Sequence, residues 1–508
     1  MWVLVVFILY LLVLAAIGVY CARLNRNLAD FVLGGRRLGV WVTAFSAQAS
    51  DMSAWLLIGL PAAAYMDGLA ALWIAVGCAA GTAFNWMIVA PRLRRATGAT
   101  DALTIPDFLA TRYGGGWWPG VRVFAVVAIL VAYASYIAAQ FIAAGTTFQT
   151  AFRDVATPWG ALTLDYHTGM FLGVGIIVLY TALGGFTAVS WTDLLQGILM
   201  VTTVVVLPIV GLIGLGWLPA LWGELHAANA NFLGLRGAEG KTGLSFLMGV
   251  CVGNLSWGLG YPGQPHILVR FMALRDPRAM RRAAFIGITW VVLAMWGAIF
   301  VGLVARATLD TPLTKLTKDR AMPLLALELM HPALAGVMIA AAVAAMMSTV
   351  DSQLLVAASA VEKDIFLPLY SRLSGKRPAD RLAVWFGRIT VLVLGAVAIP
   401  LAWRQKSVLE QVFHPWSILG ASLGPVVVLG LVSRRANRWG ASAGIVVGFV
   451  ITVFWKQVRP LFGGEAYFGN GLIPGFVLSF VLAYLVSLAT GDTAPARPDK
   501  TGRGTQPV

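Results

Sequence analysis

The chain has few charged residues and few cysteines for its length of 508 residues. Charged residues make up 12% of it and hydrophobic residues 59%, a balance that excludes an ordinary soluble domain. The three cysteines, Cys21, Cys78 and Cys251, lie in or at the ends of apolar segments without metal-ligand spacing, so we expect packing residues and no disulfides. With five scattered histidines and no phosphate-binding loop of the GxxxxGKS or GxxxxGKT type, the sequence predicts neither an enzyme nor a bound cofactor.

The chain contains many long apolar runs. We predict about thirteen membrane-spanning helices, because each run is long enough to cross a bilayer. The predicted spans are 2–22, 40–62, 68–91, 122–146, 168–186, 190–216, 243–265, 283–305, 333–359, 382–403, 408–432, 439–456 and 471–490. The sequence therefore predicts an all-α polytopic membrane protein with a single membrane domain over 1–490, followed by a disordered tail over 491–508.

The formal net charge of +15 is distributed by loop. Basic residues cluster in alternate loops, for example at Arg36, Arg94, Arg281 and Arg434, as the positive-inside rule expects of cytoplasmic loops. This distribution predicts an N-terminus outside and a cytoplasmic C-terminus. It predicts the lipid bilayer as the partner, and no nucleic acid.

Two of the predicted spans are interrupted where a plain spanning helix would not be. The segment Ser46–Ser53 places Asp51 among small hydroxyl residues, and Trp257–Pro265 contains three glycines and two prolines. Broken helices survive in lipid only where they line a protected cavity. Interrupted segments in corresponding positions of two halves indicate the binding site of a transporter, so we predict a cation-coupled solute carrier.

The two interruptions also suggest an internal repeat. Each begins a set of five predicted spans, about 40–216 and about 243–432. An odd number of helices turns the second set over relative to the first, which predicts an inverted repeat.

Hydroxyl groups at helical spacing predict a site for a monovalent cation. Residues three and four apart share a helix face. Two sets have this spacing, namely Ala49, Met52 and Ser53 around Asp51, and Ala345, Ser348 and Thr349. Hard cations prefer oxygen ligands, which hydroxyls and carbonyls released at a helix break would supply.

Other interpretations of these residues stay open. Ser348 and Thr349 are also typical of close packing between membrane helices. Asp51 could be a paired structural carboxylate, although acids inside membranes are by default functional. A second membrane acid, Asp351, could bind a hydroxyl, take part in a proton step or face the cytoplasmic vestibule.

Aromatic residues of the second interruption predict a substrate site. Trp257, Tyr261 and Pro265 recur every four residues, and the glycines between them make the backbone approachable. Aromatic walls would enclose a small apolar body, and free N–H groups of a half-helix would hold a carboxylate. Since no Lys or Arg is predicted at mid-membrane, a small amino acid suits the site better than a strong anion. The alternative is a Pro-kinked helix with aromatics at the membrane interface.

Six sequence blocks resemble those of the sodium:solute symporter family, and within it the bacterial sodium/proline symporters. In family order they are Gly34–Gly39, Ala49–Leu56, Tyr180–Phe186, Ala188–Asp193, Gly258–Ile267 and Met347–Thr349. The resemblance implies a LeuT-type 5+5 inverted repeat with one extra N-terminal and two extra C-terminal helices. It also implies a location in the bacterial cytoplasmic (inner) membrane.

The resemblance implies a role for each matching residue. The implied sodium ligands are Ala49, Met52, Ala345, Ser348 and Thr349. Residues implied in coupling are Arg36, Asp51, Ser53 and Asp193. The implied substrate contacts are Trp55, Tyr136, Trp257, Tyr261 and Pro265.

The resemblance further implies secondary active symport of sodium with a small amino acid, with L-proline as the first expectation. Pro262 and Ala54 depart from the pattern of close relatives, so the pattern alone does not fix the substrate. The alternatives are a proton-coupled or other-substrate symporter of the same fold and a transporter-like membrane sensor of a solute.

Overall fold

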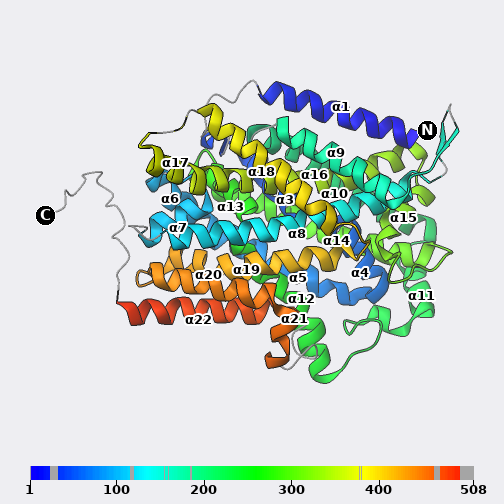
Figure 1. Ribbon diagram of the computed structural model, residues 1–508. Coiled ribbons are helices and arrows are strands. Elements are labelled where there is room, and N and C mark those ends of the chain that lie inside the picture. The colour runs from blue at the N-terminus through cyan, green and yellow to red at the C-terminus, as the bar shows by residue number, and fades with distance from the viewer. Residues whose placement is uncertain are drawn as a thin grey trace.

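The computed structural model describes residues 2–22, 33–114, 119–153, 155–157, 160–183, 186–376, 378, 380–462 and 470–491 (Figure 1). Nearly all of these residues are helical, as the sequence predicts. Within the described ranges, the exception is an antiparallel hairpin of β1 (Val155–Thr157) and β2 (Gly160–Leu162) between two helices. The predicted disordered tail lies outside the described residues from 492 onward.

The long helices lie side by side as one bundle in Figure 1. They are α1 (Trp2–Ala22), α3 (Val40–Asp51), α5 (Leu72–Phe84), α8 (Gly120–Ala151), α9 (Tyr166–Leu183), α10 (Phe186–Leu215), α14 (Met280–Thr308), α16 (Pro332–Ala360), α18 (Asp380–Leu401), α19 (Val408–Val432), α20 (Arg438–Val453) and α22 (Leu472–Thr490). Helix α1 starts at the right-hand end of the bundle in this view, whereas α22 ends at the left-hand end (Figure 1).

Short helices and tight turns connect and interrupt the long ones. The short α-helices are α4 (Leu60–Asp67), α6 (Ala90–Thr100), α7 (Ile105–Tyr113), α11 (Leu218–Ala228), α12 (Gly253–Leu255), α13 (Pro265–Ala273), α15 (Ala321–Leu329), α17 (Leu367–Ser374) and α21 (Trp455–Val458). The 3-10 and π-helical segments are η1 (Gly34–Arg36), η2 (Trp55–Gly59), η3 (Gly68–Ala71), η4 (Asn85–Val89), η5 (Ala230–Leu233), η6 (Ser245–Val252), η7 (Ser256–Gly263), η8 (Pro277–Ala279), η9 (Lys318–Arg320), η10 (Val361–Phe366) and η11 (Arg459–Phe462).

The helices have the length and hydropathy of membrane spans. Among the described residues, seven are long and apolar enough to cross a membrane, and α20 with α21 makes an eighth if this pair, bent by 81°, is one span. Three shorter apolar helices, Trp2–Ile17, Tyr166–Val178 and Trp385–Leu401, fall on further predicted spans. A multi-pass membrane protein is therefore confirmed, and the count of thirteen stays a prediction.

Both predicted interruptions are present in the structure. Helix α3 ends at Asp51, because Met52 has φ −86° and ψ 78°, and Ser53 lies between helices. The second span is a succession of η6, α12 and η7, and it turns at Gln264 before α13 begins at Pro265. Proline fits the first turn of a helix because its missing N–H would have no intrahelical partner there.

Close backbone contact joins the two interrupted segments to their neighbours. A Cβ atom at Gly258 would lie 2.5 Å from the Gly77 carbonyl oxygen, so η7 and α5 touch through their backbones. A Cβ atom at Gly260 would meet the Trp416 ring at 2.0 Å, which places η7 directly against α19. Glycine is therefore required at both positions, and the second interruption is held between α5 and α19.

Candidate functional site

The predicted sodium ligands of the first interruption meet those of α16. The Ser348 hydroxyl donates to the Ala49 carbonyl at 2.8 Å and to the Ala345 carbonyl at 3.2 Å. One residue further along each helix, the Thr349 hydroxyl donates to the Ser50 carbonyl at 3.0 Å. The carbonyls of α3 are accessible because the helix ends one residue later, at Asp51. The two sets that sequence analysis singled out thus meet in the structure, although they lie about 300 positions apart.

The helix break after Asp51 is held by a glutamine of α8. The Gln140 side chain accepts from the Ala54 N–H at 3.0 Å and donates to the Ser53 hydroxyl at 3.2 Å. Met52 lies in the break itself and is fully buried. The Ala54 N–H, a backbone group next to the break, is therefore satisfied by a side chain, as membrane interiors require. Sequence analysis missed Gln140, although an amide in the apolar span 122–146 was a signal that could have been used.

Asp51 is fully buried, and neither of its carboxylate oxygens has a hydrogen-bond partner among the described residues. Its carbonyl accepts from the Trp55 indole N–H at 3.3 Å and from the Ser53 N–H at 3.1 Å. The Tyr261 hydroxyl is near enough to act on the carboxylate, whereas no basic side chain of the described chain does. Buried charges are paired in most proteins, and Asp51 lacks the counter-charge that an ion pair would supply.

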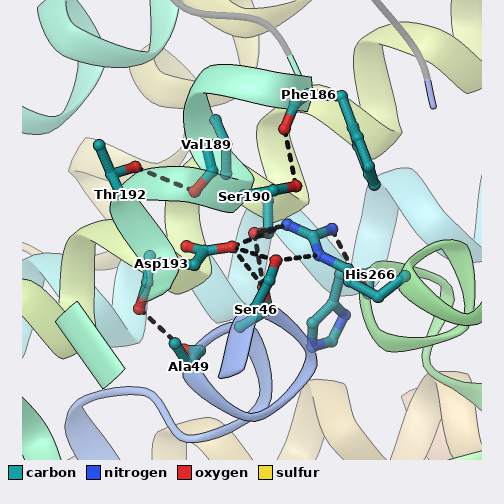
Figure 2. A network of polar contacts seen from close by, with 12 residues as sticks. Ser46, Ala49, Phe186, Val189, Ser190, Thr192, Asp193 and His266 are labelled. Carbon is teal, nitrogen blue, oxygen red and sulfur yellow. Dashed lines mark hydrogen bonds and ion pairs between the residues drawn. The ribbon is translucent and has the colours of Figure 1, made fainter. Parts of the chain in front are cut away.

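Asp193 of α10 lies in a different environment, at the centre of a polar network (Figure 2). Its Oδ2 atom accepts from the Ser46 hydroxyl at 2.6 Å and from the Ser50 hydroxyl at 3.3 Å. The same oxygen forms an ion pair with Arg270 of α13 at 3.3 Å, and both side chains are fully buried. Helices α3, α10 and α13 are thereby joined around one carboxylate.

Arg270 extends this network to a fourth helix. Its guanidinium donates to the Ser352 hydroxyl of α16, to the Ser46 hydroxyl at 3.2 Å and to the His266 carbonyl at 2.9 Å. It also lies 5.1 Å from the centre of the Phe186 ring. The prediction that no basic side chain lies inside the bundle is therefore wrong. The reason is that Pro265 starts a new buried helix, α13, instead of ending the span.

Asp351 lies one residue before Ser352 on α16 and is fully buried. The Thr181 hydroxyl of α9 donates to its Oδ1 atom, while Oδ2 has no partner among the described residues. Of the three roles left open for Asp351, the structure supports the pairing with a hydroxyl.

The predicted substrate residues lie in an aromatic cluster. The Trp55 and Trp257 rings are 4.6 Å apart, and Trp257 stacks on Phe413 at 4.7 Å. Tyr261 meets Trp416 edge-on at 5.0 Å, and the Trp416 indole N–H donates to the Trp257 carbonyl at 3.0 Å. The two residues of α19, Phe413 and Trp416, were missed because their roles depend on tertiary contacts with Trp257 and Tyr261 that the span 408–432 does not reveal.

Tyr136 and Pro265 both lie near His266, at the start of α13. The Tyr136 ring lies 6.1 Å from His266 in an edge-on arrangement, and its hydroxyl has no hydrogen bond within the described chain. His266 is held by Tyr133, whose hydroxyl lies 3.1 Å from Nδ1. Pro265 is buried at the start of α13. The structure therefore brings together all five predicted substrate residues around the second interruption.

Arg36 does not join either site. It lies in η1 before α3, has a φ of 57°, and donates to the Thr97 and Ala102 carbonyls at 2.8 and 3.0 Å. Burial lowers the pKa of its guanidinium, and nearby Asp101 opposes that effect. Arg36 thus anchors the start of α3 to α6, and any influence on coupling would act through the position of that helix.

The chain is similar in sequence to known proteins. The model of the sodium:solute symporter family matches residues 31–448. The high-affinity proline transporter PutP of Bacillus subtilis is 37% identical over 493 residues, which cover 95% of this chain and 97% of that protein. A sodium/proline symporter of Staphylococcus aureus is 36% identical over 496 residues, covering 95% of this chain and 91% of that protein.

Solved structures share the fold at much lower sequence identity. A Na+-coupled sialic acid symporter in a substrate-bound outward-open state aligns with a TM-score of 0.78 at 18% identity, covering 98% of this chain and 99% of that one. Mhp1, a nucleobase-cation-symport-1 family transporter, aligns with a TM-score of 0.55 at 15% identity, covering 92% and 96% of the two chains. The predicted family is confirmed by the family model and by these sequence relatives. This chain belongs to the sodium:solute symporter family and is a membrane transporter, not an enzyme.

Proposed function

We propose that this chain couples inward movement of sodium to uptake of L-proline by alternating access. The relatives named as proline transporters and sodium/proline symporters support both the ion and the substrate. The observation that carries the proposal is the contact of the Ser348 and Thr349 hydroxyls with the Ala49 and Ser50 carbonyls. This oxygen set has the chemistry that a hard cation requires.

In this proposal, sodium binds between α3 and α16 through the carbonyls of Ala49, Met52 and Ala345 and the hydroxyls of Ser348 and Thr349. The ion replaces the hydroxyl–carbonyl contacts and fixes the two helices relative to each other. Because the break after Asp51 lies next to this site, fixing it also orders the neighbouring substrate pocket. Sodium therefore raises the affinity for proline, and proline raises the affinity for sodium by the same factor.

The sodium gradient supplies the work of accumulation. One elementary charge crossing 100 mV releases about 2.3 kcal/mol. With both ligands bound, a helix bundle rocks against the remaining scaffold and opens the site to the inside. We propose that three further residues act in coupling. Ser53 holds the helix break, Asp193 holds the contact between α3 and α10, and Arg36 holds the start of α3.

We propose the finer architecture on the same basis. Thirteen spans form two inverted halves of five helices, about 40–216 and 243–432, with one extra helix before and two after them. The N-terminus lies outside and the tail from 491 is cytoplasmic, in a bacterial inner membrane. The opposite positions of the start of α1 and the end of α22 in the bundle support this orientation (Figure 1).

The proposal is tested by uptake of labelled L-proline into proteoliposomes with and without an inward sodium gradient. We expect accumulation that depends on sodium and that Ser348→Ala reduces by about tenfold or more, since one ion ligand is lost. Ser422→Ala is the matched control, because its buried hydroxyl donates within its own helix to the Ile418 carbonyl. Proline uptake that is equal without sodium would contradict the coupling, and absence of uptake would contradict the substrate.

Proton coupling is a second candidate, favoured by two buried acids without a full set of partners. Asp51 and one oxygen of Asp351 have no hydrogen bond within the described chain. A proton-driven carrier would accumulate proline in a pH gradient without sodium, and Asp351→Asn would abolish that uptake. The sodium proposal predicts no accumulation under those conditions.

A further inference from the structure

A small hollow lies between α13, α16 and the start of α7. It is lined by residues 103–106 at the start of α7, by Val269 of α13, and by Leu355, Val356, Ser359 and Ala360 of α16. Helix α7 lies at the left-hand end of the bundle, where α22 also ends (Figure 1). The proposed orientation makes this the cytoplasmic end.

Two helix faces connect this hollow to the proposed binding sites. On α13, Pro265 of the substrate cluster and Val269 of the hollow are four residues apart and so share one face. On α16, the proposed sodium ligand Ser348 is followed on the same face by Ser352, four residues later, and by Ser359, seven residues after that. The hollow therefore lies in line with both sites, about one turn beyond the first and about three turns beyond the second.

A layer of buried polar contacts separates the sites from the hollow. Arg270 of α13 donates to the Ser352 hydroxyl of α16. The Tyr133 hydroxyl of α8 accepts from the His266 N–H at 3.1 Å and lies 3.1 Å from its Nδ1 atom. All four residues are fully buried. A solute that leaves toward this end must separate these contacts and then cross the hollow.

The start of α7 borders the hollow and is held on a buried carboxylate. The Thr104 hydroxyl accepts from the Asp107 N–H at 3.0 Å and donates to the Asp364 carboxylate of η10 at 2.6 Å. The Arg122 guanidinium of α8 lies 3.0 Å from the Asp107 carboxylate and 3.5 Å from that of Asp364. Since the Asp364 side chain is fully buried, it depends on these partners, and they fix the first turn of α7 in place.

The two ends of α7 are held in different ways. At its C-terminal end, the Arg112 Nε atom and the Tyr113 hydroxyl donate to backbone carbonyls of α19, both at 2.6 Å. At its start, the contact with η10 is made by the Thr104 side chain. The turn before it contains Asp101 with a φ of 51°, which is uncommon for a residue other than glycine. Hinges form at such residues at the ends of elements, so the start of α7 can swing about its anchored end.

We propose that residues 103–106 are a plug in the cytoplasmic exit shared by sodium and the solute, and that Thr104 and Asp364 are positioning residues that hold this plug closed. The inference rests on the proposed function and orientation, and it adds the element that closes the exit. Release would break the hydrogen bond between Thr104 and Asp364 and withdraw the plug from between α13 and α16. One hydrogen bond is weak enough to open and close in each transport cycle.

The test measures how fast a cysteine in the hollow is labelled from the cytoplasmic side. Ser359 lines the hollow and is 3% exposed, so the closed plug should protect the thiol of Ser359→Cys. A membrane-impermeant maleimide is applied to inside-out vesicles that contain the full-length protein, and the labelled peptide is quantified by mass spectrometry. We expect Thr104→Val to raise the labelling rate about tenfold without any ligand, the worth of one hydrogen bond to a carboxylate.

Three matched variants separate the plug from a general loosening of the protein. Thr104→Ser keeps the hydroxyl and should leave the labelling rate of Ser359→Cys unchanged. Thr111→Val removes an exposed hydroxyl that donates within α7 and should leave it unchanged as well. Ser374→Cys, at an exposed serine of α17, should be labelled equally in every background. With Thr104 intact, sodium with proline should accelerate labelling of Ser359→Cys and sodium alone should not, because the exit opens with both ligands bound.

A cross-link tests the plug without removing its hydrogen bond. Ile105→Cys and Val356→Cys place one thiol on α7 and one on α16, both at the hollow. We expect a bifunctional thiosulfonate reagent to stop proline uptake in the double variant but in neither single variant. Proline binding from the outside should persist, and a reductant that cleaves the cross-link should restore uptake.

Other results would overturn the inference. If Thr104→Val leaves the labelling rate unchanged while sodium with proline still accelerates it, the exit opens without the plug, and the proposed function stands alone. Equal acceleration by Thr104→Val and Thr111→Val, or full uptake after cross-linking, would also overturn the plug. Faster labelling in Thr104→Val without any response to sodium and proline would support the plug and contradict the proposed function.

Discussion

Two buried carboxylates of this transporter, Asp193 and Asp51, lie within the same helix assembly but in opposite situations. Asp193 accepts two hydroxyl hydrogen bonds and forms an ion pair with Arg270. The Asp51 carboxylate has no basic side chain of the described chain acting on it, and the side chain that does act on it is the Tyr261 hydroxyl. The first carboxylate has a buried base beside it and joins helices through its Oδ2 atom, although its Oδ1 atom has no hydrogen-bond partner among the described residues. The second has no such base, so the presence of a counter-charge distinguishes the two acids better than burial does.

The same contrast applies to the helices around them. The Asp193 network joins α3, α10, α13 and α16 through hydrogen bonds and an ion pair between side chains. The aromatic side between α5, η7 and α19 contains the unpaired Tyr261 and Trp257 groups. Alternating access requires both kinds of region, one that keeps helices joined and one that changes its contacts when the ligand binds or leaves.

The largest expected effect is on the completed carboxylate. Asp193→Ala leaves Arg270 buried without its ion-pair partner, which should lower the free energy of unfolding by about 3–5 kcal/mol. Thermal and denaturant unfolding of the purified protein in detergent measure this loss. The double variant Asp193→Ala with Arg270→Met removes both charges and should recover a large part of it. A double variant as unstable as the sum of the single ones would contradict the pairing.

A smaller effect is expected at the clamp on the helix break. Gln140→Leu leaves the Ala54 N–H and the Ser53 hydroxyl without their partner, at a cost of about 1–3 kcal/mol in unfolding free energy. Gln140→Glu keeps the acceptor for the Ala54 N–H and should lose less. Because the break separates the ion and substrate sites, Gln140→Leu should also raise the apparent KM for sodium in uptake assays. A variant with unchanged sodium dependence would show that the clamp is purely structural.

A further prediction concerns the contact between α7 and η10, beyond both regions. The Thr104 hydroxyl donates to Asp364 at 2.6 Å and accepts the Asp107 N–H at 3.0 Å, so it joins η10 to the start of α7. Thr104→Val should cost about 1 kcal/mol in unfolding free energy through loss of this N-cap. Thr104→Ser keeps the hydroxyl and should behave like the wild type. Thr111→Val, which removes an exposed hydroxyl of α7, provides the comparison for a general effect on that helix.

The smallest effect on stability is expected at the unpaired carboxylate. Asp51→Asn replaces a buried acid that has no partner, so the free energy of unfolding should change by less than about 1 kcal/mol or rise. Proline transport should nevertheless be lost. Unfolding measured beside Asp193→Ala compares the two acids directly. If both variants lose the same stability, Asp51 is a structural acid and the contrast between the regions fails.

Much of the fold can be predicted from the sequence because membrane spans are recognised by their length and hydropathy. Both helix breaks were predicted from Ser46–Ser53 and Trp257–Pro265, and the structure has both. The pairing of Ser348 with Ala49 was also accessible, since both sets have the same i, i+3, i+4 spacing. The two helix breaks and the repeated spacing are local patterns in the sequence. They can therefore be detected in one sequence without any tertiary information.

The missed residues depend on tertiary contacts that no local pattern contains. Arg270 was overlooked because its buried position is only tolerable with Asp193, which lies 77 residues earlier. Gln140, Phe413 and Trp416 lie in otherwise regular apolar helices, and their roles arise from the breaks they face. The contacts of Arg36 with the Thr97 and Ala102 carbonyls were likewise beyond the reach of the matching motif.

The most direct measurement is proline binding to the purified protein by calorimetry, in sodium and with choline replacing sodium at constant ionic strength. The account predicts that sodium tightens proline binding by about tenfold or more, because coupling between two sites is typically worth 1–3 kcal/mol. It also predicts that Ser348→Ala removes most of this difference while Ser422→Ala keeps it. Equal proline affinity in sodium and choline would contradict the central claim that the α3–α16 contact couples the ion to the substrate.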